Sequence, residues 1–249
     1  MNSYLLGDVL LDAGTRHSTR RILRELRGQT VRAVALTHAH PDHQGAAHAI
    51  CGRLGVPLWC GVGDADLMEA GELADARPEL RRLRPSHWVN RVMEWGWRGP
   101  AHPVAHRLHE GDEVGGFSVL EVPGHSRGHL AFWRERDRVL VLGDALTNMD
   151  LVTTAYGLHD AKRAFTLDPE QNRASAQRLA ELRPYLVCFG HGPPLRDPER
   201  FRRFVATLGT RAQWIESALP GRPVTAVGGR AGAHAESPGQ GGRCPRCPS

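Results

Sequence analysis

Short apolar runs separated by polar, glycine-bearing segments fill the first 190 residues of the chain. The β-branched run at 31–36 is typical of a buried strand, and a second short run lies at 57–60. Between these runs, residues 44–54 are expected to form a helix that ends at Gly55. Strands that alternate with helices in this way predict an α/β layer architecture.

Further elements are predicted on both sides of this unit. Strands are expected at 4–6, 9–12, 117–122, 130–133, 138–142 and 185–189. Helices are expected within 16–28 and over 63–76, 169–182 and 197–219. Asp168 and Asp197 each precede a proline, as N-cap residues often do, and should open the last two helices.

The closest cluster of candidate ligand residues in the sequence directly follows the predicted strand at 31–36. His38, His40, Asp42 and His43 lie within six residues, in a chain that carries 14 histidines. A polar loop with chance histidines is the alternative, but imidazole and carboxylate are ligands that suit zinc, iron and manganese. Because open α/β sheets bind ligands at the carboxyl ends of their strands, we interpret this cluster as a metal site.

Three more candidate ligands follow predicted strands in the same way. His125, Asp144 and His191 each lie in or beside a glycine-bearing loop just past an apolar run. Glycine lets the backbone approach a metal closely, so these loops are suited to converge on one site. His129 follows His125 by four residues and is not counted as a ligand. It is either a histidine that is hydrogen-bonded in the core or one that supports the site.

Together these motifs, which begin with the Asp12-Ala13-Gly14 turn, resemble the metallo-β-lactamase fold superfamily and, within it, the glyoxalase II-like hydrolases. The resemblance covers about residues 2–195 and implies an α/β (α+β) fold, a four-layer αββα sandwich with a dinuclear site. It implies that one metal is held by His38, His40 and His125, the other by Asp42, His43 and His191, and both by Asp144. Asp12 would orient a ligand histidine, a role that metal sites generally fill. Family members usually carry one or two strands before the first one predicted here.

The composition changes this picture little. The net charge is +5, and Lys162 is the sole lysine among 32 basic residues. The arginines are spread among 27 acidic residues rather than gathered in a patch, so no nucleic acid partner is expected. No apolar run has the length of a membrane span, no signal sequence opens the chain, and the five cysteines show no disulfide framework. We therefore expect a cytoplasmic protein that acts on a small-molecule substrate without contacting a membrane.

Residues 1–220 are predicted to form one hydrolase domain, and residues 221–249 a disordered tail rich in glycine, proline and arginine. The lone Cys244/Cys247 pair in this tail lacks the second pair that a structural zinc site needs. The aromatic residues near 85–100, including Trp95 and Trp97, either pack the segment against the domain or form a lid over the metals. Residues 145–168 should form the opposite wall of the pocket.

The predicted ligand set implies a specific chemistry. Two metal ions that share Asp144 can also share a water, whose pKa falls from about 15.7 to near 7 on zinc. The resulting hydroxide would attack the activated carbonyl of a thioester or ester, while one metal stabilises the developing oxyanion. Asp42 is the predicted catalytic residue, since it could orient the nucleophile or carry a proton to the leaving group. Zn²⁺ is the expected metal, although the same ligands accept iron or manganese.

Several alternatives remain beside this interpretation. A lactonase would typically have a tyrosine shortly after the bridging aspartate, whereas Ala145, Leu146 and Thr147 follow Asp144. A mononuclear iron persulfide dioxygenase shares most ligands, but its signature is not apparent in that stretch. A glutathione thioester is less favoured because glyoxalase II has an additional C-terminal helical region. A non-catalytic metal-binding member of the fold would usually have lost ligands, and all seven expected positions are filled here.

Overall fold

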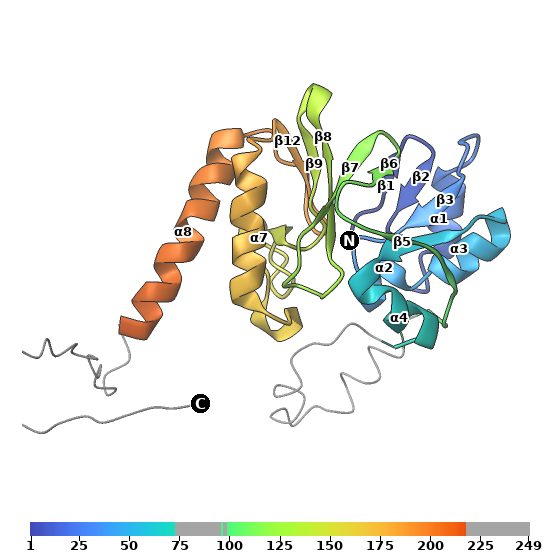
Figure 1. Cartoon of the computed structure of the whole chain (residues 1–249), viewed down its shortest axis with the longest axis horizontal. Coiled ribbons are helices and arrows are strands. Elements are labelled where there is room, and N and C mark those ends of the chain that lie inside the picture. The colour runs from blue at the N-terminus through green and yellow to red at the C-terminus, as the bar shows by residue number, and fades with distance from the viewer. Residues whose placement is uncertain (73–95, 97–98, 218–249) are drawn as a thin grey trace, which may run out of the picture.

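The computed structural model describes residues 1–72, Gly96 and residues 99–217. Two five-stranded sheets lie face to face, and helices cover the outer face of each sheet (Figure 1). The predicted four-layer αββα sandwich is therefore confirmed. Among the described residues, no helix combines the length and the apolar character that crossing a membrane requires.

The first sheet joins a hairpin to a parallel unit. Its strands, in spatial order, are β1 (Tyr4–Leu6), β2 (Val9–Leu11), β3 (Ala33–Ala35), β4 (Leu58–Gly61) and β5 (Val104–Leu108). The β1–β2 hairpin is antiparallel and turns at Gly7, whose φ of +57° suits glycine. From β2 to β5 the strands are parallel, so their carboxyl ends lie along one edge of the sheet. The strand β5 was not predicted, because it is a mostly exposed edge strand without apolar alternation.

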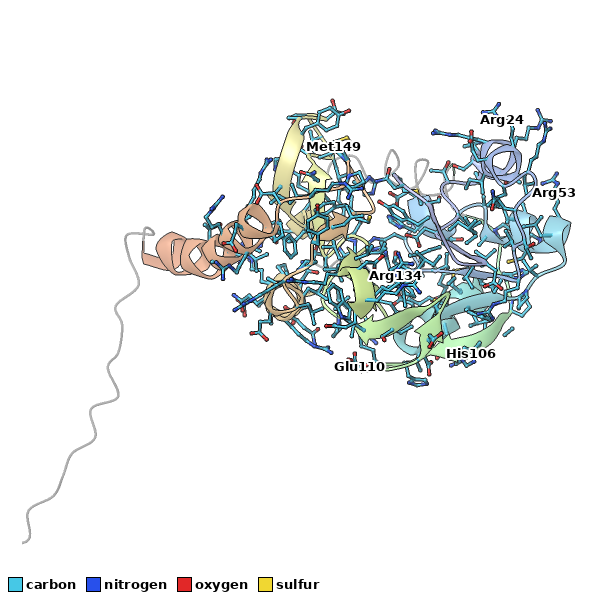
Figure 2. All side chains as sticks on the ribbon, turned by 90° about the horizontal axis from the view of Figure 1, so that it is seen from above. Arg24, Arg53, His106, Glu110, Arg134 and Met149 are labelled. Atoms are coloured by element: carbon cyan, nitrogen blue, oxygen red, sulfur yellow. The ribbon has the colours of Figure 1, made fainter. Side chains whose placement is uncertain are left out.

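The helices of this half are α1 (Thr19–Glu25), α2 (Pro41–Gln44), α3 (Ala47–Leu54) and α4 (Val62–Ala70). The single helix predicted over 44–54 is wrong at its start. Pro41 begins the separate four-residue helix α2. Ala46, whose φ of −100° and ψ of 2° are not helical, separates α2 from α3. Gly55, in the left-handed region at φ +67°, ends α3 as predicted. Figure 2 shows Arg24 of α1 and Arg53 of α3 at the outer surface, away from the sheet.

The second sheet is mostly antiparallel. Its strands, in spatial order, are β12 (Leu186–Cys188), β9 (Val139–Val141), β8 (Leu130–Arg134), β7 (Phe117–Glu121) and β6 (Glu113–Val114). The short helix η1 (Glu135–Asp137) connects β8 to β9, and β12 pairs with β9 in parallel. The helices α7 (Pro169–Glu181) and α8 (Pro198–Ser217) lie beside this sheet on the outside of the sandwich (Figure 1).

Both long helices begin as the sequence predicts. The Asp168 carboxylate accepts hydrogen bonds from the backbone N–H groups of Glu170 and Gln171, each at 3.0 Å. Asp197 accepts one from Arg200 N at 2.9 Å. These bonds satisfy donors that an uncapped helix start would leave free, which explains why an Asp-Pro pair is a dependable start signal.

A two-stranded hairpin, β10 (Leu146–Met149) and β11 (Tyr156–Asp160), occupies the segment that was expected to form a wall of the pocket, for which no strands were predicted. Its register shifts between Thr147 and Met149, so the period-two pattern of a regular strand is broken. The short helix η2 (Arg163–Phe165) follows it. This hairpin was not predicted, because its polar residues are mixed among apolar ones and the bulge breaks the alternation that indicates a strand.

Three apolar layers lie between the four structural layers, and the strands explain why. In β2, Val9 and Leu11 pack between the sheets, whereas Leu10 packs beneath the helices of the first half. In β8, Leu130 and Phe132 share the inter-sheet core, and the alternate residues Ala131 and Trp133 pack towards α7 and α8. This alternation follows from the period of two along a strand, and it fixes the register of both sheets.

The predicted tail at 221–249, with its Cys244/Cys247 pair, lies outside the described residues, as does the aromatic segment that carries Trp95 and Trp97. The predictions of a disordered tail and of an aromatic lid stay predictions. Cys51, Cys60 and Cys188 are buried free thiols, which agrees with the absence of a disulfide framework among the described residues.

Candidate metal centre

The seven predicted ligand residues meet at one place in the structure. They follow the carboxyl ends of β3, β7, β9 and β12, so both sheets contribute to the site. Three overlapping groups have ligand atoms within 4.8 Å of one another: His38, His40 and His125; His38, His43 and Asp144; and Asp42, His43 and His191. The sequence therefore identified the residues that the fold brings together, and their role as ligands stays a prediction.

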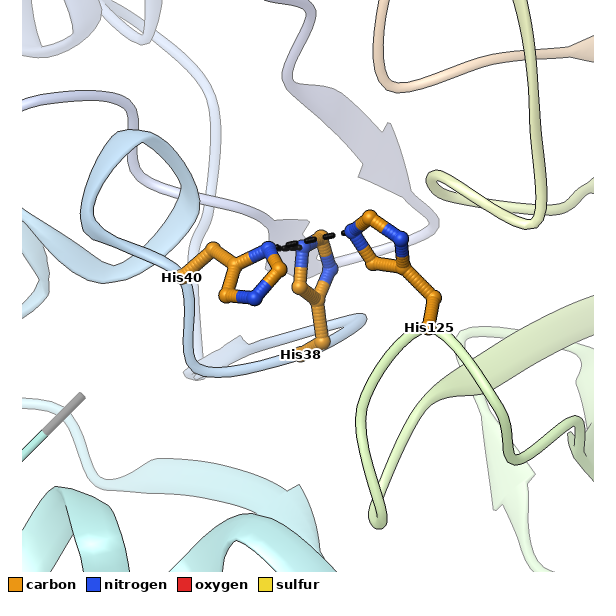
Figure 3. Close-up of side chains that lie close together, drawn as sticks. All are labelled: His38, His40 and His125. Atoms are coloured by element: carbon orange, nitrogen blue, oxygen red, sulfur yellow. Dashed lines mark hydrogen bonds between the residues drawn. The ribbon is translucent and has the colours of Figure 1, made fainter. Parts of the chain in front are cut away.

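The first group is a compact triad of imidazoles (Figure 3). The Nε2 atoms of His38 and His125 each lie 3.0 Å from Nδ1 of His40. Imidazole nitrogens placed about 2.0–2.1 Å from a tetrahedral zinc stand about 3.4 Å apart, so the triad is close to the spacing of metal ligands. All three residues are buried or nearly so, which removes water as a competing partner.

Hydrogen bonds fix which nitrogen of His38 carries its proton. The single hydroxyl proton of Thr37 is donated to Asp12, with Oγ1 2.9 Å from Oδ2. Towards His38, Thr37 Oγ1 is therefore an acceptor, and it lies 3.0 Å from Nδ1. His38 accordingly carries its proton on Nδ1 and presents the Nε2 lone pair to the site, which is the form that binds a metal.

The same reasoning applies to His125. The hydroxyl of Thr166 donates to the backbone carbonyl of Lys162 at 3.0 Å, so it accepts from Nδ1 of His125 at 3.2 Å. The Nε2 lone pair of His125 then points into the triad. A proton on His40 Nδ1 could be shared with these two lone pairs, whereas a metal ion satisfies all three nitrogens at once.

His43 is oriented by Asp12. Its Nδ1 donates to Asp12 Oδ2 at 2.8 Å, and Asp12 also accepts from the backbone N–H of Thr37 at 2.8 Å. Asp12 has a φ of +60°, a conformation that costs energy for a residue other than glycine and that turns its carboxylate towards these donors. These contacts are those that the predicted orienting role of Asp12 requires.

The second half of the site combines imidazoles with carboxylates. His191 Nε2 lies 3.0 Å from Asp42 Oδ2 and 3.3 Å from Asp144 Oδ2, and His43 Nε2 lies 3.4 Å from the same Asp144 oxygen. Despite this proximity, His43 Nε2, His191 Nε2 and Asp144 Oδ1 are buried without a hydrogen-bond partner in the described part of the chain. Buried polar atoms are rarely left in this state, and a divalent cation held among them would satisfy all three.

The close packing of Gly190 points to the same conclusion. A Cβ atom on this residue would overlap Asp144 Oδ1 and lie 2.8 Å from Cε1 of His43. The backbone before His191 thus passes directly over the carboxylate. Only glycine leaves room for this approach, and the result is a cradle of nitrogen and oxygen donors that fits a dinuclear metal centre.

The pKa values of the histidines are shifted in opposite directions in the two halves of the site. Burial, followed by the neighbouring His43, holds the pKa of His38 well below its usual value, and burial and the neighbouring His40 do the same to the pKa of His125. Burial also lowers the pKa of His40. The triad is therefore neutral, as metal ligation requires, without any need to displace protons.

In the other half, burial disfavours the charged form of His191, but the carboxylates of Asp144 and Asp42 together outweigh it and raise the His191 pKa to about 9. The same opposition, with Asp144 and Asp12 dominant, raises the pKa of His43. Burial tends to raise the pKa of Asp42 and of Asp144. The neighbouring histidines reverse this effect, because His43 lowers the pKa of Asp42, and His191 and His43 lower that of Asp144. Without metal, imidazolium protons supply the positive charge that a divalent ion would otherwise supply.

This arrangement predicts the pH dependence of the metal-free protein. A histidine whose pKa is raised on folding stabilises the fold fully below its unfolded value of 6.5, and the contribution is lost as the pH rises through about 9. We expect the Tm of the chelator-treated chain to fall between pH 6.5 and 9. His191→Gln should reduce this fall. A metal-free Tm that rises over this range would contradict the account.

His129 supports the site without being a ligand. Its Nε2 accepts the backbone N–H of Asp144 at 3.1 Å, and its Nδ1 donates to the Val122 carbonyl at 3.3 Å. Burial lowers the His129 pKa to about 4, so the ring is neutral and both nitrogens are already used. Its hydrogen bonds satisfy it in the core and join it to the backbone of Asp144, and its supporting role in the site stays a prediction.

Sequence reasoning found Asp12 and His129 but missed three other residues that contact the ligands or their loops. Thr37 and Thr166 set the protonation of His38 and His125, and Asp64 accepts hydrogen bonds from both loops of the triad. Threonine and aspartate are common in loops and helix starts, so residue type alone gave no signal. The position of Thr37, at a strand end directly before a ligand, is the one local clue.

Comparisons with known proteins agree with the geometry. A family model described as the metallo-beta-lactamase superfamily matches residues 2–191. The probable metallo-hydrolase YflN of Bacillus subtilis is 30% identical over 226 residues, which cover 83% of each chain. A hydroxyacylglutathione hydrolase of Bdellovibrio bacteriovorus is 35% identical over 92 residues, covering 35% of this chain and 33% of that protein. The crystal structure of TTHA1623 in a di-iron-bound form superposes with a TM-score of 0.54 at 29% identity, covering 85% of this chain and 91% of that one.

Proposed function

Because the chain belongs to the metallo-beta-lactamase superfamily and its relatives mark it as a metallo-hydrolase, we propose that it hydrolyses thioester or ester bonds with two divalent metal ions. The observation that carries the proposal is the set of seven nitrogen and oxygen donors, arranged in three groups that overlap at His38 and His43, with Asp144 in the group that links the other two. Zn²⁺ is the expected metal by its ligand preference. Iron is the principal competitor, since the similar protein TTHA1623 was solved with two irons.

Bound to these donors, two divalent ions would lower the pKa of a shared water and polarise a substrate carbonyl. The chain's own contribution is to hold the ligands in their metal-binding protonation states. Thr37, Thr166 and Asp12 keep protons on the nitrogens that face away from the site. His129 fixes the backbone of Asp144, so the carboxylate shared by both halves is held in place.

Asp42 is suited to the catalytic role. Its side chain is 23% exposed, against 5% for Asp144, so it is the carboxylate of the site that a substrate can approach. His43 and His191 lower its pKa, so it is ionised. We propose that Asp42 orients the attacking nucleophile and then carries a proton to the leaving group.

The choice of a thioester or ester rests on the local similarity to a hydroxyacylglutathione hydrolase, which covers about a third of that protein. A small-molecule substrate fits a site that is buried among loops, and neither nucleic acid nor a membrane is proposed as a partner. The lactonase alternative is less favoured, because the residues after Asp144, which are Ala145, Leu146 and Thr147, are buried and include no tyrosine. The group of Asp42, His43 and His191, beside the imidazole triad, favours two metal ions over the single iron of a mononuclear dioxygenase.

Activity assays test this proposal. The metal-free chain is reloaded with Zn²⁺, Fe²⁺ or Mn²⁺ and offered thioesters, esters and lactones, while oxygen consumption is followed with a persulfide substrate. We expect hydrolysis of a thioester or ester, and we expect Asp42→Asn to lower kcat by roughly 10²–10⁴-fold, the size of a general acid–base contribution. Oxygen uptake without hydrolysis would instead identify a dioxygenase.

A further inference from the structure

The Asp64 carboxylate lies between the two loops that carry the imidazole triad. It belongs to the first turn of α4 and is fully buried, with 0% of its surface exposed. One oxygen accepts the backbone N–H of Ala39 at 3.0 Å and the Ser126 hydroxyl at 2.6 Å, and the other accepts the backbone N–H of Gly128 at 2.7 Å. None of these donors is a basic side chain.

The positions of these donors are informative. Ala39 is the residue between His38 and His40, Ser126 directly follows His125, and Gly128 is the third residue after it. A single carboxylate therefore joins the loop after β3 to the loop after β7. These two loops come from different sheets, and together they supply every nitrogen of the triad.

Three glycines allow α4 to approach the second loop this closely. A Cβ on Gly61 would overlap the Gly128 carbonyl oxygen, and one on Gly63 would lie 2.7 Å from the backbone carbon of Arg127. A Cβ on Gly128 would overlap the backbone nitrogen of Asp64. The helix start and the His125 loop are thus packed backbone to backbone, which is the separation at which a short aspartate side chain reaches both loops.

We propose that Asp64 is a positioning residue for the metal held by His38, His40 and His125, because it sets the separation of the two ligand loops. The inference rests on the proposed function. Asparagine cannot replace it, because an amide has one accepting oxygen and one donating NH₂ group. Whichever way the amide is turned, its NH₂ group meets an N–H donor, either Ala39 N or Gly128 N.

The effect should be confined to one metal position. The other half of the site is held by different contacts, since Asp12 orients His43 and His129 anchors Asp144. Loss of the Asp64 bonds would therefore weaken one ion and leave the other bound. A residue that merely stabilised the fold would affect both ions alike.

The test is a titration of the metal-free full-length chain with Co²⁺, followed by visible absorption and by competition with a chelator. We expect Asp64→Asn to bind one of two ions roughly 10- to 100-fold more weakly, as is typical when a group that orients ligands is lost. The visible spectrum of that ion should change as well. Ser126→Ala, which removes a single donor, should produce a smaller change in the same direction.

Asp66→Asn is the matched control. Asp66 lies on the same helix, its side chain is 83% exposed, and it pairs with Arg107 at the surface. Wild-type affinity and spectrum are expected for this variant. The thermal unfolding of each metal-free variant is measured in parallel, to separate altered metal binding from a damaged fold.

The proposal is overturned if Asp64→Asn binds both ions with wild-type affinity and spectrum. If Asp64→Asn does not fold without metal, Ser126→Ala decides, and wild-type behaviour of that variant overturns the proposal. A wild-type chain that takes up no Co²⁺ contradicts the proposed function and this inference together. If the wild type takes up two Co²⁺ ions and the Asp64→Asn and Ser126→Ala variants bind them with the same affinity and spectrum, the result contradicts this inference alone.

Discussion

Replacing Asp144 with asparagine is expected to abolish hydrolysis and to release metal from both positions. Its Oδ2 atom lies 3.4 Å from His43 Nε2, 3.3 Å from His191 Nε2 and 3.9 Å from His125 Nε2, so it borders both halves of the site. Asparagine keeps the shape but removes the negative charge that two divalent ions would share. The loss of metal affinity should exceed the roughly 10- to 100-fold effect of losing an orienting partner.

Asp150→Asn is the control for this experiment. Asp150 follows Asp144 by six residues and lies in the turn after β10, its side chain is 11% exposed, and it pairs with Lys162, which directly precedes η2. Its replacement should cost some stability and leave metal content and kcat near the wild-type values. Elemental analysis and steady-state kinetics of both variants make the comparison. An Asp144→Asn protein that keeps two metals and full activity would show that Asp144 is not shared between them.

Gly190→Ala should be almost as damaging, although it adds a single methyl group. The new Cβ would overlap Asp144 Oδ1 and press on the His43 ring. Asp144 cannot retreat easily, because its backbone is tied to His129 and its side chain is buried. We expect weaker metal binding in the half that contains His43 and His191, together with about 1–3 kcal/mol of overpacking cost in the free energy of unfolding.

The matched control adds the same methyl group where there is space. Gly52 lies inside α3, and a Cβ there meets nothing within 4 Å. Gly52→Ala should keep wild-type metal affinity and gain up to about 1 kcal/mol of stability, because alanine favours the helix. Chelator competition and chemical unfolding measure both effects. Equal metal affinity in Gly190→Ala and the wild type would mean that the loop can move away from Asp144.

The fold was predictable where the signals are local. The strand that precedes the His38 loop is a β-branched apolar run, and Asp168 and Asp197 open their helices through hydrogen bonds that each Asp-Pro pair announces. The strand β5 and the β10–β11 hairpin were not predicted, because exposed edge positions and a bulge remove the alternation of apolar residues. The break between α2 and α3 depends on how the loop that carries His38 and His40 turns, and the local sequence does not indicate this turn.

In the candidate site, too, the residues with local sequence signals were predicted and those without them were not. Histidines and aspartates at strand ends identify themselves by residue type and by place, and the structure brings all seven together. Three of their partners do not, since Thr37, Thr166 and Asp64 have common residue types, and the contacts that join Thr37 to Asp12, Thr166 to His125 and Asp64 to Gly128 link segments far apart in the chain. Asp64 is separated from Gly128 by 64 positions in sequence, and only the packing of α4 against the second loop joins them.

The central claim is that these residues hold two metal ions, and calorimetric titration of the metal-free chain tests it most directly. We expect two equivalents of Zn²⁺ to bind per chain near neutral pH, with protons released as His191 and His43 give up the charge that the carboxylates stabilise. The double variant His38→Ala with His40→Ala should lose the ion of the triad. Binding of one equivalent or less by the wild type, or unchanged binding by the double variant, would contradict the account.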